Sequence, residues 1–305
     1  MLHLILPTRS SLRAADLPPA LAALLARGAA DPAPADSLAQ ALCRATRIDP
    51  CPLAALSLLE EGGTPGDAYW LRADPVYLHL NIDQLVLTDP RDLALTADAA
   101  KALCASLNAH FRADGLELLA PAPDRWYLRL EREPTLHTTA LGRVIGQGIQ
   151  PHLPSGPEAA RWRSIMNEAQ MLLFEHPVNQ AREAEGLPPV NSLWFWGGGF
   201  LRALEPTRAV RLYGPPLPGA APLPATLDEL DPAREAVVVL EGLRGLSGTA
   251  LAAQLLRYET AWFAPALAAL KSRRLAGLTL YLTGDQPAQH YLRPRHAWRF
   301  WRRAQ

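Results

Sequence analysis

The sequence Glu175-His-Pro-Val-Asn-Gln-Ala-Arg182, followed by Glu185-Gly-Leu-Pro-Pro-Val-Asn191-Ser-Leu-Trp-Phe-Trp-Gly-Gly-Gly199, is the densest group of polar and glycine motifs in the chain. Arg182 could hold an anion with two fixed N–H donors, and the glycine run could let the backbone approach a ligand closely. The residue types alone instead favour a proline-capped turn, in which the asparagines satisfy backbone groups and the tryptophans enter the core.

The order of these residues resembles a known signature. Archaeal-type, cofactor-independent phosphoglycerate mutases of the alkaline phosphatase superfamily carry H-P-V-N-x-x-R and then G-x-x-P-A-N-x-x-W-x-W-G-x-G, which residues 176–199 resemble. The stretch is also similar to bacterial RpfE-type regulatory proteins, which share that mutase similarity. Gly66-Asp-Ala-Tyr-Trp-Leu-Arg72-Ala-Asp74 resembles the G-D-x-A-x-R-x-N strand of the mutases, with Asp74 in place of the asparagine. Residues 141–156 resemble their linker into the next helix.

The same resemblance indicates which metal ligands the chain lacks. Where the mutases carry D-G-x-x-D after the first strand, this chain reads Leu6-Pro-Thr-Arg-Ser10, and where they carry D-x-x-G-H it reads Glu241-Gly-Leu-Arg-Gly-Leu-Ser247-Gly. Gln286 replaces the histidine of their final D-H pair, which leaves Asp285 as the remaining metal-ligand candidate. A two-metal phosphoryl-transfer site needs several Asp and His ligands and an activated nucleophile. We therefore expect no catalytic residues, no metal site and no cofactor.

Apolar runs predict the sheet. Residues 2–6 are typical of a buried first strand, and residues 236–241 and 278–283 are apolar runs on either side of a predicted helix at 249–271, which indicates a parallel β-α-β unit. Residues 66–130 contain short strand-like runs and a helix at 97–112, a long helix follows at 158–174, and residues 177–199 are predicted to be turns. Further helices are predicted at 17–26, 37–44 and 51–61.

The resemblance implies an α/β fold made of a reduced alkaline-phosphatase-like sheet with helices on both faces, plus an inserted α+β domain. The sheet domain would be discontinuous and degenerate, and would be built from residues 1–65 and 200–305. The inserted mutase-type domain would span residues 66–199.

Charge and hydropathy exclude several classes of protein. Lys plus Arg and Asp plus Glu both number 30, so the net charge is zero and no overall field attracts nucleic acid or an anionic membrane. No stretch approaches the roughly 18 apolar residues of a membrane span, and the N-terminus lacks the pattern of a signal peptide. We expect a cytoplasmic protein with neither a nucleic-acid nor a membrane partner.

The final segment, Arg293-Pro-Arg-His-Ala-Trp-Arg-Phe-Trp-Arg-Arg303, interleaves aromatic residues with arginines. Such a composition can stack bases and bind phosphates. The favoured interpretation is that the aromatic residues anchor the C-terminus to the core while the arginines pair locally or stay solvated. An arginine cluster shared with a phosphometabolite site remains an open alternative, and His290 and His296 are interpreted as surface histidines.

Polar residues buried within apolar or turn-forming stretches should meet one another or a ligand, because each unpaired group would cost about 1–3 kcal/mol. We predict a ligand site in which Arg182 is the best candidate for holding a phosphate or carboxylate. The residues of this predicted site are Arg72, Asp74, His176, Asn179, Arg182 and Asn191.

The resemblance and the missing ligands together favour a non-catalytic, phosphoglycerate-mutase-like protein that regulates or senses a phosphorylated small metabolite, with a protein as a further candidate partner. The alternative is a divergent phosphoglycerate mutase or phosphatase with a rebuilt metal site. A purely structural, partner-binding role is the third hypothesis.

Overall fold

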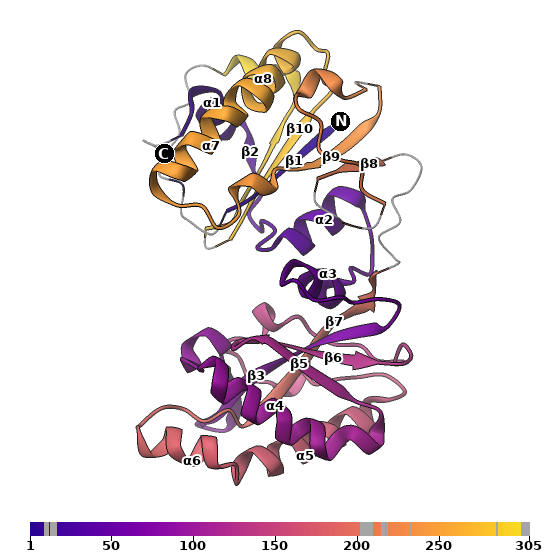
Figure 1. Cartoon of the computed structure of the whole chain (residues 1–305), viewed down its shortest axis with the longest axis vertical. Coiled ribbons are helices and arrows are strands. Elements are labelled where there is room, and N and C mark those ends of the chain that lie inside the picture. Colours follow the sequence, from indigo (N-terminus) through magenta and orange to yellow (C-terminus); the bar gives the residue numbers. More distant parts are fainter. Residues whose placement is uncertain are drawn as a thin grey trace. The chain divides into compact units, whose positions relative to one another are not determined.

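The computed structural model describes residues 1–8, 12, 17–201, 210–214, 217, 219–231, 233–284 and 286–299 (Figure 1). The chain divides into two compact units, one made of Met1–Asp49 and Leu204–Gln305 and the other of Pro50–Ala203. Each unit combines a sheet with helices, which confirms the predicted α/β class. No helix in the described ranges is both long and apolar enough to cross a membrane.

The first unit is built on a sheet whose described strands follow the order β2-β11-β10-β1-β9-β8. β1 pairs in parallel with β10 and with β9, and β8 continues the parallel pairing beyond β9. β11 is antiparallel to β10, and β2 is antiparallel to β11. The strands are β1 (Leu2–Pro7), β2 (Ala29–Ala30), β8 (Val210–Tyr213), β9 (Glu235–Val239), β10 (Leu278–Thr283) and β11 (Ala288–Leu292).

Helices cover both faces of this sheet. Alternate residues of β1 face a core shared with α1 (Pro19–Arg27), α7 (Gly248–Tyr258) and α8 (Ala264–Lys271). α2 (Leu38–Thr46) packs against β1, β9 and β10 from the other side. Because strands covered on both faces have no solvent side, β1, β9 and β10 appear in the sequence as unbroken apolar runs.

The predicted parallel crossover is confirmed, since β9, α7, α8 and β10 follow one another and both strands pair in parallel with β1 between them. The helix expected at 249–271 is interrupted by a π-helical turn, Glu259–Phe263, just before Pro265. Proline has no N–H and its ring clashes with the carbonyl four residues earlier, so a wider turn at this point relieves the clash.

The second unit contains an antiparallel sheet around one long strand, β3, which pairs with β4, β6 and β7. β5 completes the sheet by pairing with β6. The strands are β3 (Tyr69–Asn81), β4 (Gln84–Thr88), β5 (Glu117–Ala122), β6 (Arg125–Leu130) and β7 (Ser192–Phe200). The helices are α3 (Leu53–Glu60), α4 (Ala97–Phe111), α5 (Ala159–Phe174) and α6 (Pro177–Ala184).

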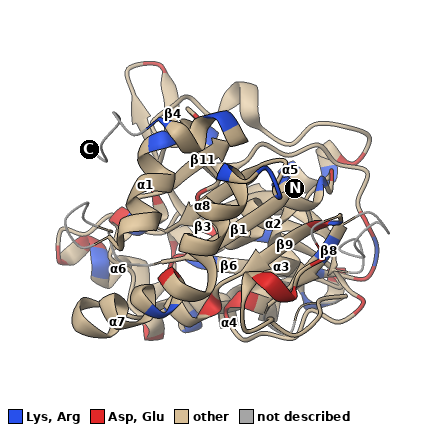
Figure 2. Cartoon of the chain, turned by 90° about the horizontal axis from the view of Figure 1, so that it is seen from above, with Lys and Arg blue, Asp and Glu red and all other residues tan. Residues whose placement is uncertain are grey.

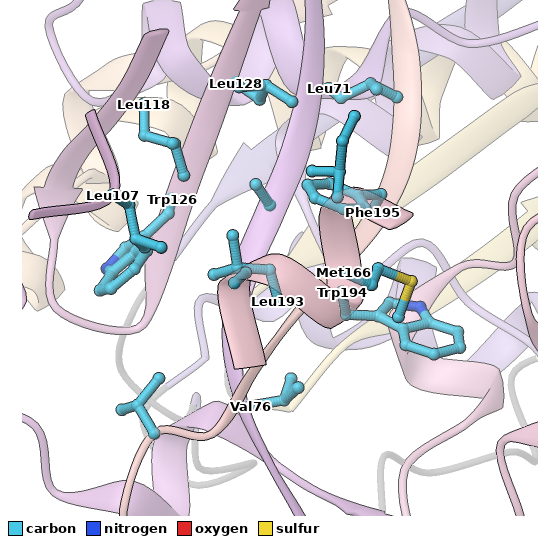
Figure 3. Packing of buried hydrophobic residues seen from close by; sticks show 14 of the residues in the cluster. Leu71, Val76, Leu107, Leu118, Trp126, Leu128, Met166, Leu193, Trp194 and Phe195 are labelled. Atoms are coloured by element: carbon cyan, nitrogen blue, oxygen red, sulfur yellow. The ribbon is translucent and has the colours of Figure 1, made fainter. Parts of the chain in front are cut away.

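Large apolar side chains from the sheet, α4 and α5 form the core of this unit. Figure 3 shows Leu107 of α4 beside Trp126, and Met166 of α5 beside Trp194. The rings of Trp162 and Phe195 meet edge to face with their centroids 5.1 Å apart. This geometry favours an aromatic pair beyond the area that it buries.

The unit begins earlier in the sequence than predicted. α3 packs against β3 and β7, so residues 50–65 belong to the second unit. The sequence predicts these residues in the sheet domain. The apolar spacing of this helix indicates that it is buried, but not on which sheet.

The structure corrects the prediction that residues 177–199 are turns, because this segment contains both α6 and β7. Pro177 occupies the first turn of α6, where its missing N–H is not needed. The glycine run lies within β7, and a Cβ atom at Gly199 would be 2.6 Å from the Cα atom of Pro52. The backbone that this glycine allows to come close is therefore the entry to α3.

The packing of α5 gives a direct test of the core. Trp162 is 1% exposed, whereas Met171 on the same helix is 74% exposed. We predict that Trp162→Ala lowers the free energy of unfolding by about 3–5 kcal/mol, because it leaves a cavity beside Phe195. Met171→Ala, the matched control, should change it by less than about 0.5 kcal/mol. Urea denaturation followed by circular dichroism measures both, and similar effects of the two substitutions would contradict the described packing.

Candidate functional site

A buried ion pair lies on the face of the β3 sheet opposite the main core. Tyr69, Leu71 and Ala73 join that core, so the alternation of a strand turns Arg72 and Asp74 to the other face. The Nη2 and Nε atoms of Arg72 donate to Oδ1 of Asp74 at 2.6 and 3.0 Å. Both side chains are almost fully buried. The structure thus brings together two of the six residues predicted for the site.

Asp74 also accepts hydrogen bonds from two neighbouring strands. The backbone N of Trp126 in β6 lies 3.2 Å from its Oδ1, and Nε1 of Trp196 in β7 lies 2.7 Å from its Oδ2. The guanidinium carbon of Arg72 lies 5.1 Å from the ring centroid of Tyr127 and 5.4 Å from that of Trp196. At these distances an aromatic ring attracts a cation.

The pair keeps its arginine charged. Burial disfavours the charged guanidinium, but the adjacent Asp74 carboxylate outweighs this effect and raises the pKa of Arg72 above its ordinary value. Burial raises the pKa of Asp74, and the donors around it oppose that rise. No hydrogen bond from the Nη1 group of Arg72 occurs among the described residues, and 8% of the side chain remains exposed.

Two further polar groups lie near this pair. The hydroxyl of Tyr127 and the carboxylate of Glu61 are close enough to interact, although neither the hydroxyl nor Oε2 of Glu61 makes a hydrogen bond of normal geometry within the described structure. Oε1 of Glu61 pairs with Nε of Arg125. Burial raises the pKa of Tyr127, with the negative charge of Glu61 contributing, so the phenol stays protonated. Neither residue belongs to the site predicted from the sequence, although the alternation that buries Trp126 places Tyr127 on the face of Arg72.

Arg182, the residue favoured for anion binding, contacts backbone carbonyls instead. Its Nε and Nη2 atoms donate to the carbonyl oxygen of Pro188 at 3.1 and 2.9 Å, and Nη2 also donates to the carbonyl oxygen of Leu93. Desolvation lowers the pKa of Arg182. Both atoms of the fork that would grip a phosphate are occupied in holding α6 to two loops.

The side-chain amides of Asn179 and Asn191 form hydrogen bonds with backbone groups. Asn179 accepts from the N of Val190 at 2.9 Å and donates to the carbonyl oxygens of Val190 and Leu173, both at 2.7 Å. Asn191 accepts from the N of Leu78 and donates to its carbonyl oxygen, both at 2.8 Å. The two amides therefore anchor the segment before β7, as the turn interpretation of these asparagines predicts.

His176 caps α6, the helix that also carries Asn179 and Arg182, and its carbonyl oxygen accepts from the N of Asn179 at 2.9 Å. Its Nδ1 accepts a hydrogen bond from the N of Val178 at 3.2 Å, and its Nε2 lies 2.9 Å from Oγ of Ser106. An Nδ1 atom that accepts a hydrogen bond carries no proton, so the neutral ring carries its proton on Nε2 and donates it to Ser106. Desolvation lowers the pKa of His176 and favours this neutral form. The serine is consequently not activated by a base.

A groove of about 790 Å³ borders this serine and histidine. Polar residues of α4 and α5 line one part of it, including His110 and Glu168, which interact at 3.1 Å. Met171 and Phe174 line another part and are 74% and 78% exposed. The groove combines an apolar rim with polar groups, among them the His110–Glu168 pair and the carboxylate of Glu175.

No group of three or more His, Cys, Asp or Glu side chains that could hold a metal ion occurs in the described part of the chain. Asp285 and residues 9–11 lie outside the described residues. His296 is buried and His290 is half-buried, which corrects their interpretation as surface histidines. His290 belongs to β11 and His296 to the following turn, and burial lowers the pKa of each.

No family model matches the chain. A segment of 56 residues is 46% identical to the 2,3-bisphosphoglycerate-independent phosphoglycerate mutase of Methanothrix thermoacetophila and covers 18% of this chain and 14% of that protein. The probable mutase of Geobacter sulfurreducens is 45% identical with the same coverage. The mutase of Methanosarcina mazei is 35% identical over 71 residues, or 23% of this chain and 17% of that protein.

Two solved structures align along most of the chain. The cofactor-independent phosphoglycerate mutase from Thermoplasma acidophilum covers 96% of this chain and 89% of its own, with a TM-score of 0.41 and 15% identity. The PH0037 protein from Pyrococcus horikoshii covers 96% and 87%, with a TM-score of 0.39 and 13% identity. In sequence, the similarity to cofactor-independent phosphoglycerate mutases is partial, because the matched segments span less than a fifth of those relatives.

Proposed function

We propose that this protein is a phosphoglycerate-mutase-like regulatory protein of the RpfE type, which binds a phosphorylated metabolite without turning it over. We further propose that it acts in the cytoplasm, with the unit Pro50–Ala203 as the inserted mutase-type domain. The partial similarity to the mutases supports the class of ligand. The chemistry at the edge of the parallel sheet supports the absence of turnover.

The observation that carries the proposal is an arginine paired with the carboxylate that follows β9. The carboxyl ends of parallel strands meet at one edge of a sheet, which is where such folds bind ligands. At this edge Nη2 of Arg244 donates to Oε1 of Glu241 at 2.8 Å, and the hydroxyl of Thr8 after β1 donates to the carbonyl oxygen of Thr283 at 3.2 Å. These groups are charge-compensated or neutral, whereas two divalent ions require several free anionic ligands.

The proposed ligand site is centred on Arg72 rather than on Arg182. Arg72 is held rigidly by Asp74, and its Nη1 group is an unused charged donor. Tyr127 pairs with Arg72 across β6 and β3, and its hydroxyl and the nearby Oε2 of Glu61 make no hydrogen bond of normal geometry within the described structure. A small molecule with an anionic group and a hydroxyl would satisfy these atoms, and a phosphorylated hydroxy acid has both.

The first prediction concerns catalysis. The purified protein, with manganese or magnesium added, should not interconvert 2- and 3-phosphoglycerate and should not hydrolyse either compound, because Glu241 is already paired with a cation. The assay is a coupled phosphoglycerate mutase assay and a phosphate-release assay, with an active mutase as control. Turnover that is lost in Glu241→Gln would instead establish the divergent enzyme with a rebuilt metal site.

The second prediction tests the site at Arg72. Tyr127→Phe removes a hydroxyl that makes no hydrogen bond of normal geometry but keeps the ring, so it should leave the unfolding temperature unchanged or slightly raised in the absence of ligand. With 3-phosphoglycerate, the wild type should show a rise in unfolding temperature, and Tyr127→Phe a smaller one.

Tyr77→Phe, on the same strand as Arg72, is the matched control and should retain the wild-type shift. Equal shifts in all three proteins would place the ligand elsewhere. No shift with 3-phosphoglycerate, 2-phosphoglycerate or inorganic phosphate would favour the purely structural, partner-binding role.

The third prediction separates Arg182 from the ligand. Arg182→Ala leaves the carbonyl oxygens of Leu93 and Pro188 without donors, so it should lower the free energy of unfolding by about 2–4 kcal/mol. The shift caused by 3-phosphoglycerate, measured from the lower unfolding temperature of the variant, should persist. An Arg182→Ala protein that is as stable as the wild type but shows no shift in unfolding temperature with 3-phosphoglycerate would instead indicate that the anion binds at Arg182 of α6.

A further inference from the structure

A pocket of about 470 Å³ lies between the loop after α8 and the turn after β11 in the first unit. Pockets for small molecules commonly measure about 300–1,000 Å³. The residues that line it are Arg273, Ala276, Arg293, Pro294, Arg295 and Trp298. Three of these six side chains are cations and none is acidic.

The positive charge in the pocket is not compensated. Arg293 donates its Nε to the hydroxyl of Tyr291 at 3.2 Å, and Arg295 directs its Nε to Nε2 of His296 at 3.4 Å. Neither partner is a carboxylate, and the ion pairs of the described residues include none with these three arginines. Elsewhere Lys and Arg are interspersed with Asp and Glu (Figure 2), so this pocket concentrates one sign of charge in a chain of zero net charge.

The backbone that positions one of these arginines is strained. Arg273 follows the end of α8 with a φ of 60°, in a left-handed conformation that glycine usually adopts at this point of a helix. This conformation is uncommon for residues other than glycine, and Arg47, Ile82 and Ala94 also adopt it among the described residues.

An aromatic surface completes the pocket. The indole of Trp298 is 59% exposed, and Nζ of Lys271 lies 6.0 Å from its ring centroid. An exposed indole beside arginines suits a flat base that carries phosphates, because bases stack on aromatic rings in a sequence-tolerant way.

We infer that this pocket binds a nucleoside diphosphate or triphosphate, whose base stacks on Trp298 while its phosphates contact Arg273, Arg293 and Arg295. A volume of about 470 Å³ favours a single nucleotide over a strand of nucleic acid, which needs a longer basic groove. The site is distinct from the one at Arg72 and does not depend on the proposed function.

Isothermal titration calorimetry on the full chain tests the inference with ATP, tripolyphosphate and adenosine as probes. ATP should bind at least tenfold more tightly than either of the others, because only ATP engages both the indole and the arginines. Trp298→Ala should weaken the binding of ATP by about tenfold and leave the binding of tripolyphosphate unchanged. Trp298→Phe should retain most of the affinity for ATP. The double variant Arg273→Gln with Arg295→Gln should weaken the binding of both ATP and tripolyphosphate by about tenfold or more.

Arg257→Gln, which removes an exposed arginine of α7 outside the pocket, is the matched control and should bind ATP as the wild type does. Circular dichroism checks that each variant is folded. The inference is overturned if ATP does not bind, if it binds no more tightly than tripolyphosphate, or if Arg257→Gln weakens it as much as the pocket variants do. Tighter binding of a single-stranded oligonucleotide than of ATP would also overturn it, in favour of nucleic acid.

Discussion

The buried carboxylate of Asp74 is the interaction on which the second unit depends. It accepts from Arg72 on its own strand, from the backbone of Trp126 on β6 and from the indole of Trp196 on β7. Removing one partner from a buried charge pair typically costs about 3–5 kcal/mol, because the other charge is left uncompensated. The pair therefore fixes the register of three strands and holds the guanidinium in one position, which a ligand site on that face requires.

The sequence predicts the elements whose burial is uniform. β1, β9 and β10 are covered on both faces and appear as apolar runs, and α4 and α5 show helical spacing. β3 is a single strand of 13 residues that contains Pro75, whereas the sequence predicts only short strand-like runs in this region. Its pairing with β6 ends at Arg72 and its pairing with β4 begins at Tyr77, so the proline lies where β7 alone is paired and a missing N–H is tolerated.

The site was predictable only in part, because sequence identifies buried polar residues but not their partners. Arg182 and Asn179 do find partners, as the cost of burying unpaired groups predicts. Those partners are backbone carbonyls of Pro188, Leu93, Leu173 and Val190. Every residue has a carbonyl oxygen, so the sequence does not show which carbonyl accepts a hydrogen bond. An arginine guanidinium that anchors loops therefore cannot be distinguished, from sequence alone, from one that binds an anion. The side chains of Asn179 and Asn191, within residues 176–199, thus also fix the backbone that leads into β7.

The position of β1 at the centre of its sheet has a consequence for the order of folding. Its partners on both sides, β9 and β10, lie more than 200 residues later in the sequence, whereas residues 50–203 form a continuous unit with its own core. Contacts of such long sequence separation close slowly, and domains generally fold as units during synthesis. β1 therefore stays unpaired during synthesis until residues 235–283, which contain both of its partner strands, have left the ribosome. Until then its apolar side chains are available to chaperones and to aggregation.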